Sequence, residues 1–104
     1  MKTDLVYDEF KEFEVARDYG TDIFDKIGYN HAFRFPNNYG ASVIKHVGSY
    51  GYEKDLFELA VLEYENGDDE NHGWLCYDTE ITDDVIGYLS NEEVLELLNK
   101  IKAL

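Results

Sequence analysis

The stretch Phe57–Thr82, FELAVLEYENGDDENHGWLCYDTEIT, decides the fold of this chain. Apolar residues fill both alternating faces of Leu56–Tyr64, which is typical of a strand in the centre of a sheet. Gly67 interrupts this run, and Trp74–Tyr77 follows as a second short strand. Between the two strands lies the very acidic segment Glu65–His72. We therefore predict an antiparallel hairpin with an acidic loop, around which the rest of the chain is built.

Two helices are predicted before the sheet. Within Asp4–Tyr19, the side chains of Val6, Phe10 and Phe13 recur at helical spacing and would form one apolar stripe. A shorter helix is predicted at Ile23–Ile27, because Thr-Asp precedes it and a glycine follows it.

Two further strands precede the hairpin. His31–Phe35 alternates apolar and polar residues, as a half-buried strand does. Pro36–Gly40 is rich in turn residues, and the β-branched run Ala41–Val47 would be the returning strand. The following loop, Ser49–Tyr52, carries two tyrosines and predicts an aromatic contact patch, although packing of these rings in the core is the alternative.

The C-terminal part predicts two helices. Thr82 would cap a short helix that runs through Leu89. Ser90 and Glu93 have the spacing of a capping box, and Asn91–Ala103 is amphipathic.

Together these elements predict a single α+β domain over residues 1–104. The expected fold is a four-stranded antiparallel β-meander with two N-terminal and two C-terminal helices that cover one sheet face. Residues 1–28 would form a helical N-terminal extension, and residues 29–104 the sheet with the C-terminal helices.

Composition predicts a folded cytoplasmic protein. Hydrophobic residues make up 44% of the chain and aromatic residues 15%, which suffices for a packed core. The single cysteine, Cys76, permits no intrachain disulfide and favours a reducing compartment. We see neither a signal peptide in the first residues nor an apolar run of the about 20 residues that cross a bilayer, so we expect no membrane association.

The charge is unusual in size and in distribution. The net charge is −14, and Glu53–Asp84 contains twelve carboxylates and one lysine, whereas Lys26–Tyr52 contains three cationic side chains and no acidic one. This favours a basic partner over direct nucleic-acid binding, although solubility alone also explains an acidic surface. Carboxylates on alternate strand residues give about one charge per 6.8 Å, against about one per 1.7 Å in duplex DNA. A nucleic-acid mimic would therefore need the loop 65–72, the turn 78–84 and one face of the predicted N-terminal helix combined.

No motif for catalysis or for a cofactor is specific. Asp68, Glu70 and His72 alternate, but they lack the later ligands of a calcium loop, and the three histidines lack zinc-ligand spacing. Cys76 lies in an apolar strand without a nearby base and is expected to be a core residue. We predict no catalytic residue, metal or cofactor.

Several short runs carry a resemblance to a known family. They are Asn38–Val43, Ser49–Gly51, Leu59–Leu62 and, above all, Leu75–Leu89 (LCYDTEITDDVIGYL). From Phe35 to Leu104 the chain resembles a small uncharacterised family of bacteriophage and prophage proteins. The resemblance implies a phage context, in which small acidic proteins often inhibit host enzymes or host defence, as anti-CRISPR and anti-restriction proteins do.

These observations lead to a functional hypothesis. We predict a non-enzymatic, phage-encoded binding protein that inhibits a host nucleic-acid-handling or defence protein by occupying its basic groove, possibly as a DNA or RNA mimic. The alternative is a structural or assembly accessory of a phage complex that self-associates, for example as a homodimer. The predicted partner-binding residues are Glu63, Glu65, Asp68, Asp69, Glu70, Asp83 and Asp84, which supply charge, and Tyr50, Tyr52 and Trp74, which supply non-polar anchors.

Overall fold

The computed structural model describes residues 3–15, 28–64, 74–75 and 85–104. Its elements in chain order are η1 (Asp8–Phe13), β1 (Glu14–Val15), β2 (Gly28–Arg34), β3 (Tyr39–His46), η2 (Tyr52–Lys54), β4 (Phe57–Glu63), β5 (Trp74–Leu75), β6 (Ile86–Leu89) and α2 (Asn91–Lys102). The two η elements are 3-10 helices, and α2 is the one α-helix among the described residues. None of the helices described is long and apolar enough to cross a membrane.

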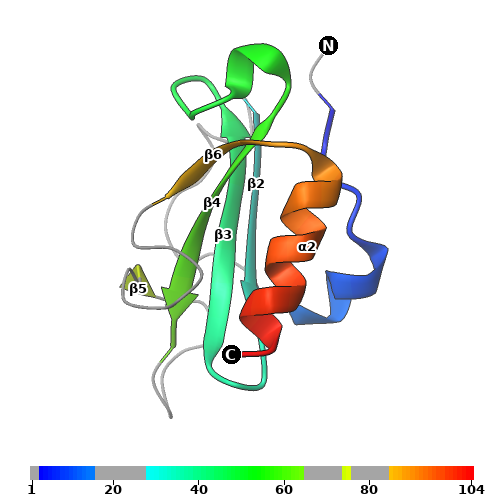
Figure 1. The fold of residues 1–104 in the computed structure, drawn as a ribbon, viewed down its shortest axis with the longest axis vertical. Coiled ribbons are helices and arrows are strands. Elements are labelled where there is room, and N and C mark those ends of the chain that lie inside the picture. The colour runs from blue at the N-terminus through cyan, green and yellow to red at the C-terminus, as the bar shows by residue number, and fades with distance from the viewer. Residues whose placement is uncertain (1–2, 16–27, 65–73, 76–84) are drawn as a thin grey trace.

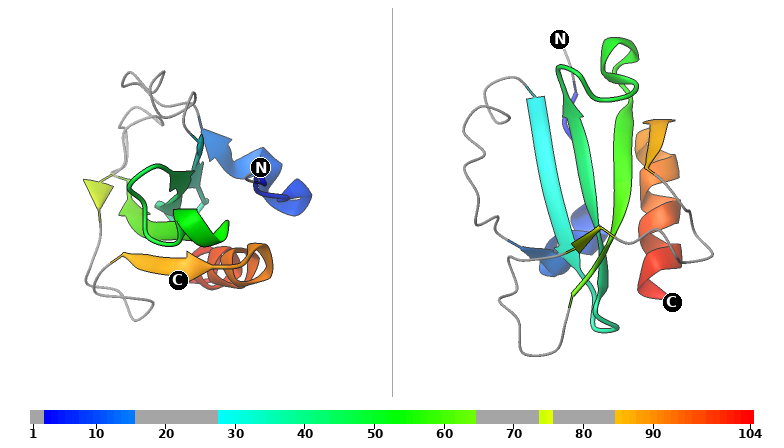
Figure 2. Two further views of the ribbon diagram at one scale, coloured as in Figure 1. Left: turned by 90° about the horizontal axis from the view of Figure 1, so that it is seen from above. Right: turned by 90° about the vertical axis from the view of Figure 1, so that its left-hand side faces the viewer.

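The strands form one antiparallel sheet in the order β1-β2-β3-β4-β5, and β6 also pairs with β4. The strands β5 and β6 share one edge of β4, because β5 pairs with Leu62 and Glu63 whereas β6 pairs with Phe57 and Leu59. The six described strands therefore occupy five positions across the sheet, because β5 and β6 lie end to end beside β4. The helix α2 and the N-terminal segment lie on the same side of this sheet (Figures 1 and 2). The fold class is therefore α+β, as predicted, with a different number of strands and helices.

The main core lies between this sheet face and its cover. In β2, β3 and β4, the paired residues Phe33, Ala41 and Val61 stand side by side and are fully buried. The cover supplies its own apolar side chains, which are Leu5, Phe10, Val94, Leu98 and Ile101. One continuous core thus joins segments from both ends of the chain.

The strand β4 is buried on both faces. Phe57, Leu59 and Val61 belong to the main core, while Ala60 and Leu62 are buried on the opposite face. The predicted central strand is confirmed, since a strand covered on both sides buries apolar residues on both of its faces.

The N-terminal helix predicted at Asp4–Tyr19 is wrong over its described part. Residues 3–7 are irregular, and only η1 and β1 follow them. The backbone amides that would begin a helix bind side chains instead: Leu5 N–H donates to Asp4 Oδ1 at 2.7 Å, and Val6 N–H donates to Asn91 Oδ1 at 2.7 Å. Val6 consequently points outward and is 62% exposed. The second predicted helix, Ile23–Ile27, lies outside the described residues.

The helix predicted from Thr82 to Leu89 is also wrong over its described part. Ile86–Leu89 forms β6, which pairs with β4. The edge of β4 beyond β5 offers unpaired backbone groups, and a short run with Gly87 has little helical preference to oppose that pairing. The final helix begins where predicted: Glu93 N–H donates to Ser90 Oγ at 3.2 Å, and Ser90 N–H donates to Glu93 Oε1 at 3.0 Å, which completes the capping box.

The C-terminal end of α2 is held by the β2–β3 turn. The Nδ2 group of Asn37 donates to the carbonyl oxygens of Ile101, Lys102 and Leu104 at 2.9, 3.1 and 3.1 Å. The Ile101 carbonyl also accepts from the Leu104 amide at 3.1 Å, and the Asn37 amide adds a cap that is supplied from the sheet. Figure 1 accordingly shows the C-terminus beside this turn, at the opposite end of the molecule from the N-terminus.

Candidate functional site

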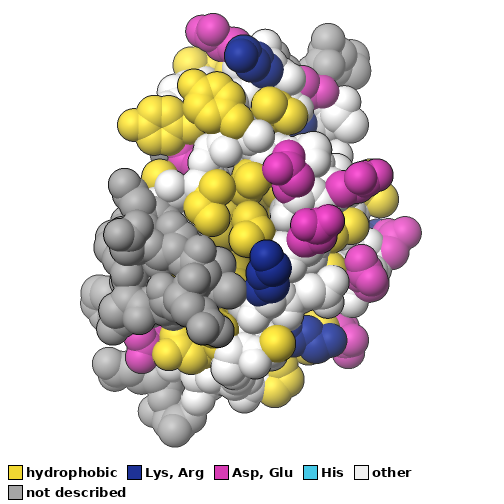
Figure 3. Space-filling view, in the orientation of Figure 1, with side chains coloured by type: hydrophobic (Ala, Val, Ile, Leu, Met, Phe, Trp, Pro, Cys, Tyr) yellow, Lys and Arg dark blue, Asp and Glu magenta, His cyan; other side chains and the backbone are white. Residues whose placement is uncertain are grey.

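A hollow of about 440 Å³ opens at the end of the sheet where the chain passes from β3 to β4. We call it the tyrosine hollow; it is lined by Val47, Gly48, Ser49, Tyr50, Gly51, Tyr52, Glu53, Lys54 and Tyr88. The space-filling view shows hydrophobic side chains gathered at this upper end, with acidic side chains on the neighbouring surface over α2 (Figure 3). Its size is in the range of about 300–1,000 Å³ that is usual for ligand sites.

The β3–β4 connection builds one wall of the tyrosine hollow. Ser49 fixes its first turn, since its hydroxyl donates to the His46 carbonyl at 2.8 Å and accepts from the His46 amide at 3.1 Å. Gly51 follows with φ +97° and precedes η2. On the far side, Tyr50 N–H donates to Glu58 Oε1 at 3.0 Å. The turn is thus held from two sides while its tyrosine side chains remain at the surface.

Tyr88 supplies the opposite wall from β6. The pairs Phe57↔Leu89 and Leu59↔Ile86 leave one extra residue in β6, which is a β-bulge. Tyr88 sits in this bulge with φ +59°, a left-handed conformation in which a side chain costs about 1–2 kcal/mol. Its amide lies 3.4 Å from the Tyr50 carbonyl and donates to it.

Close backbone contact joins the two walls. A Cβ atom on Gly51 would lie 3.0 Å from Tyr88 Cα, and one on Gly87 would lie 2.5 Å from Tyr50 Cβ. Only glycine at both positions allows this approach. The fold therefore brings together tyrosines from two segments that are far apart in the sequence.

Large apolar surfaces are left open here. The side chains of Val47, Tyr50 and Tyr88 are 59%, 60% and 55% exposed. Lys54 adds a cation, because its Nζ lies 5.8 Å from the centroid of the Tyr88 ring. Aromatic rings beside charged groups are typical of binding surfaces, where they supply contact area at low entropic cost.

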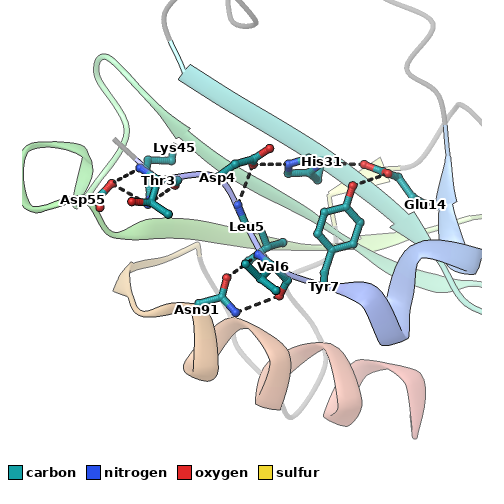
Figure 4. Close-up of polar contacts among 10 residues, drawn as sticks. All are labelled: Thr3, Asp4, Leu5, Val6, Tyr7, Glu14, His31, Lys45, Asp55 and Asn91. Carbon is teal, nitrogen blue, oxygen red and sulfur yellow. Dashed lines mark hydrogen bonds and ion pairs between the residues drawn. The ribbon is translucent and has the colours of Figure 1, made fainter. Parts of the chain in front are cut away.

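A second polar constellation lies under the N-terminal segment (Figure 4). His31 Nε2 is 2.7 Å from Asp4 Oδ1, and His31 Nδ1 is 2.7 Å from Glu14 Oε2. The Tyr7 hydroxyl donates to Glu14 Oε1 at 2.6 Å. Burial, together with the hydrogen bond to Glu14 and its charge, raises the pKa of Tyr7 above its ordinary value, so the phenol stays protonated. We call these four residues the histidine clasp.

In the histidine clasp, each of the two ring nitrogens of His31 faces a carboxylate oxygen at hydrogen-bond distance. Both ring nitrogens are occupied, and the side chain of His31 is only 13% exposed. The clasp consequently fastens the N-terminal segment to β2 and leaves no ring nitrogen for a substrate.

Lys45 fastens the same segment further along. It is 1% exposed, and its Nζ donates to the Thr3 carbonyl at 2.7 Å and to Asp55 Oδ1 at 2.9 Å. The ammonium also lies 3.8 Å from the centroid of the Phe57 ring. The hydrogen bond from Lys45, followed by that from the Thr3 amide, lowers the pKa of Asp55 to about 2. A buried ammonium needs such partners, and here they hold the N-terminal segment against the sheet.

The structure unites only part of the predicted site. Tyr50 and Tyr52 lie together in the tyrosine hollow. Glu63 is exposed at the other end of β4, opposite Trp74 of β5, so it does not join them. Six predicted carboxylates lie outside the described residues: Glu65, Asp68, Asp69, Glu70, Asp83 and Asp84.

Tyr88 was missed because Ile86–Leu89 was assigned to a helix. An isolated glycine within a short apolar run is a signal for a β-bulge, and Gly87 could have pointed to it. In the part of the chain that the structure describes, no three His, Cys, Asp or Glu side chains are placed to hold a metal ion.

Comparisons with protein-family models, with curated proteins and with solved structures find no match to this chain. The resemblance of residues 35–104 to a bacteriophage family therefore stays a prediction.

Proposed function

We propose that this protein is a non-enzymatic, acidic binding protein that captures a basic partner protein through the tyrosine hollow. Residues 35–104 resemble a family of phage proteins. In that context the partner is a host protein of the cytoplasm with a basic nucleic-acid-binding groove, and the protein acts as its inhibitor. Anti-CRISPR or anti-restriction activity would be of this type.

One observation carries the proposal: Tyr88 is exposed at the surface although its backbone conformation lowers the stability of the fold. Its backbone is in the left-handed region, where glycine or asparagine would be relaxed, and the residue is 55% exposed. Backbone strain of this kind persists where it serves a function. Packing in the core does not account for it here, because the Tyr88 side chain is exposed. Tyr50 and Val47 extend the same surface.

Charge complementarity favours a basic partner. The chain has a net charge of −14, which would speed encounter with a cationic groove and make binding sensitive to salt. Exposed carboxylates also stand on the two elements that cover the sheet, η1 and α2: Asp8, Glu9, Glu92, Glu93 and Glu96. Carboxylates of the N-terminal segment, which mimicry of a phosphate backbone would need beside the loop 65–72 and the turn 78–84, are thus available, and those of α2 would add to them.

Two polar side chains among the described residues, His31 and Lys45, have structural contacts that fit a function without catalysis. His31 has both ring nitrogens engaged by carboxylates, and Lys45 is buried beneath the N-terminal segment. Neither is placed to accept a proton from a bound substrate.

The test compares three forms of the protein as bait in a bacterial lysate. These are the unchanged chain, Tyr88→Asn, and the matched control Val6→Ser, which removes an equally exposed apolar side chain elsewhere (Val6 is 62% exposed). Asparagine tolerates the left-handed backbone, so the fold is kept. We expect a nucleic-acid-binding protein that is retained by the unchanged chain and by Val6→Ser but lost with Tyr88→Asn.

The captured protein is then purified and assayed for nucleic-acid binding. The unchanged chain should block that binding, and the block should weaken as salt is raised. Capture that is equal with all three baits would overturn the role of the tyrosine hollow. Light scattering of the unchanged chain at low salt tests the accessory alternative, and a dimer that Tyr88→Asn dissolves would favour it.

A further inference from the structure

The tyrosine hollow already holds a cation of its own. Lys54 extends from η2 and places its Nζ 5.8 Å from the centroid of the Tyr88 ring. From this contact, and resting on the proposed function, we infer that the hollow receives an arginine side chain of the partner, and that Lys54 occupies part of this place until the partner arrives.

The contact of Lys54 is loose compared with the buried ones. Lys45 lies 3.8 Å from the Phe57 centroid, and Arg34 lies 5.0 Å from the ring of Tyr64, which is 3% exposed. Lys54 itself is exposed. A lysine in water on an exposed ring is held weakly and is easily displaced.

The chemistry of the lining selects a cation. Three phenol rings offer negative faces, and Glu53 adds a carboxylate at the rim. Lys54 is the single basic side chain among the lining residues, against the −14 of the whole chain. An anionic ligand would be opposed by the net charge of the whole chain.

Arginine fits better than lysine. Its planar guanidinium stacks on aromatic faces and gives up its hydration more readily than an ammonium does. The hollow of about 440 Å³ has room for a flat group beside the tyrosines. Basic grooves of nucleic-acid-binding proteins present arginine for the same stacking and ionic contacts.

The test is an NMR titration of the unchanged chain with three short capped peptides, Gly-Arg-Gly, Gly-Lys-Gly and Gly-citrulline-Gly. Citrulline has the shape of arginine without its charge. We expect saturable shifts at Tyr50, Tyr52 and Tyr88 with the arginine peptide, smaller ones with the lysine peptide and none with citrulline. Equal shifts with citrulline, or arginine shifts that avoid these tyrosines, would overturn the inference.

A pair of variants tests the role of Lys54. Lys54→Met and Lys100→Met remove the same charge, but Lys100 stands in the last turn of α2, away from the tyrosine hollow. Lys54→Met should bind the arginine peptide about two- to fivefold more tightly, as expected for loss of an exposed cation–π competitor, and Lys100→Met should change little. If Lys54→Met binds no tighter than Lys100→Met, the placeholder role is wrong.

The two proposals can fail separately. If the partner protein still requires Tyr88 but the arginine peptide does not reach the tyrosine hollow, the binding function stands and the arginine inference falls. If the arginine peptide binds there but capture of the partner is indifferent to Tyr88→Asn, the proposed function falls instead.

Discussion

His31 Nε2 lies 2.7 Å from Asp4 Oδ1, and this contact joins the N-terminal segment to the second strand across 27 positions of the sequence. With Glu14 on the opposite ring nitrogen, the imidazole is held between two carboxylates. The segment from Thr3 to Phe10 is thereby kept over the core, into which it buries Leu5 and Phe10.

The first prediction concerns this clasp. Gln in place of His31 has both of its N–H groups on one nitrogen and cannot face Asp4 and Glu14 from two sides as the ring does, so His31→Gln should lower the free energy of unfolding by about 1–3 kcal/mol. Hydrogen exchange should rise chiefly at the amides of residues 5–10, because that segment loses its fastening. Urea denaturation and exchange mass spectrometry measure the two effects. Glu9→Gln, which alters an exposed side chain of the same segment, is the control. An unchanged exchange pattern would contradict the role of the clasp.

The second prediction is a pH dependence. The folded protein lowers the pKa of Asp55 from 3.8 to about 2, so Asp55 contributes stability that is fully present above about pH 4 and is lost as pH falls toward 2. Asp55→Asn should destabilise the protein by about 1–2 kcal/mol at neutral pH, a modest value because the carboxylate is 38% exposed. The difference between the two proteins should shrink as the pH falls from about 4 to about 2. Urea unfolding curves across this range measure it, and a difference that persists at pH 2 would refute the assignment.

The third prediction separates stability from binding at Tyr88. Tyr88→Gly or Tyr88→Asn relieves the left-handed strain and should raise the free energy of unfolding, by up to about 1 kcal/mol. The same substitutions should abolish capture of the partner. Thermal unfolding gives the first quantity and the bait assay the second. A loss of stability together with a loss of binding would mean that the ring is a packing element.

The fourth prediction concerns the contact between the walls of the tyrosine hollow. Gly87→Ala places a methyl group 2.5 Å from Tyr50 Cβ, so one wall must move. We expect a loss of about 1–3 kcal/mol, as for other overpacked sites. Gly48→Ala is a useful contrast, because no atom lies within 4 Å of its added methyl and only its φ of +94° opposes the change. The tyrosine ring resonances should shift in Gly87→Ala and stay in place in Gly48→Ala.

Patterns that depend on neighbouring residues could be predicted from the sequence. The two apolar faces of β4 and the Ser90–Glu93 capping box are local, and both were found. The strand β6 was harder to predict, because its four residues become a strand only through the free edge of β4 and Gly87 is a weak local signal for it. The N-terminal segment was misassigned for a similar reason, since Val6 binds Asn91, 85 positions away. The same distinction holds for the candidate site. Tyr50 and Tyr52 are close in the sequence and could be predicted together, whereas Tyr88 comes near them only through the fold.

The amide of Asn37 that caps α2 fixes the position of the C-terminal residue, which matters when the protein is attached to a surface or to another protein. It holds Leu104 at the β2–β3 turn, whereas Thr3 contacts Asp55, which directly follows η2 and the lining of the tyrosine hollow. A fusion or surface linker at Leu104 therefore begins far from the hollow, whereas the chain at Thr3 lies beside it. Sensors and affinity resins built from this chain should be tethered through Leu104.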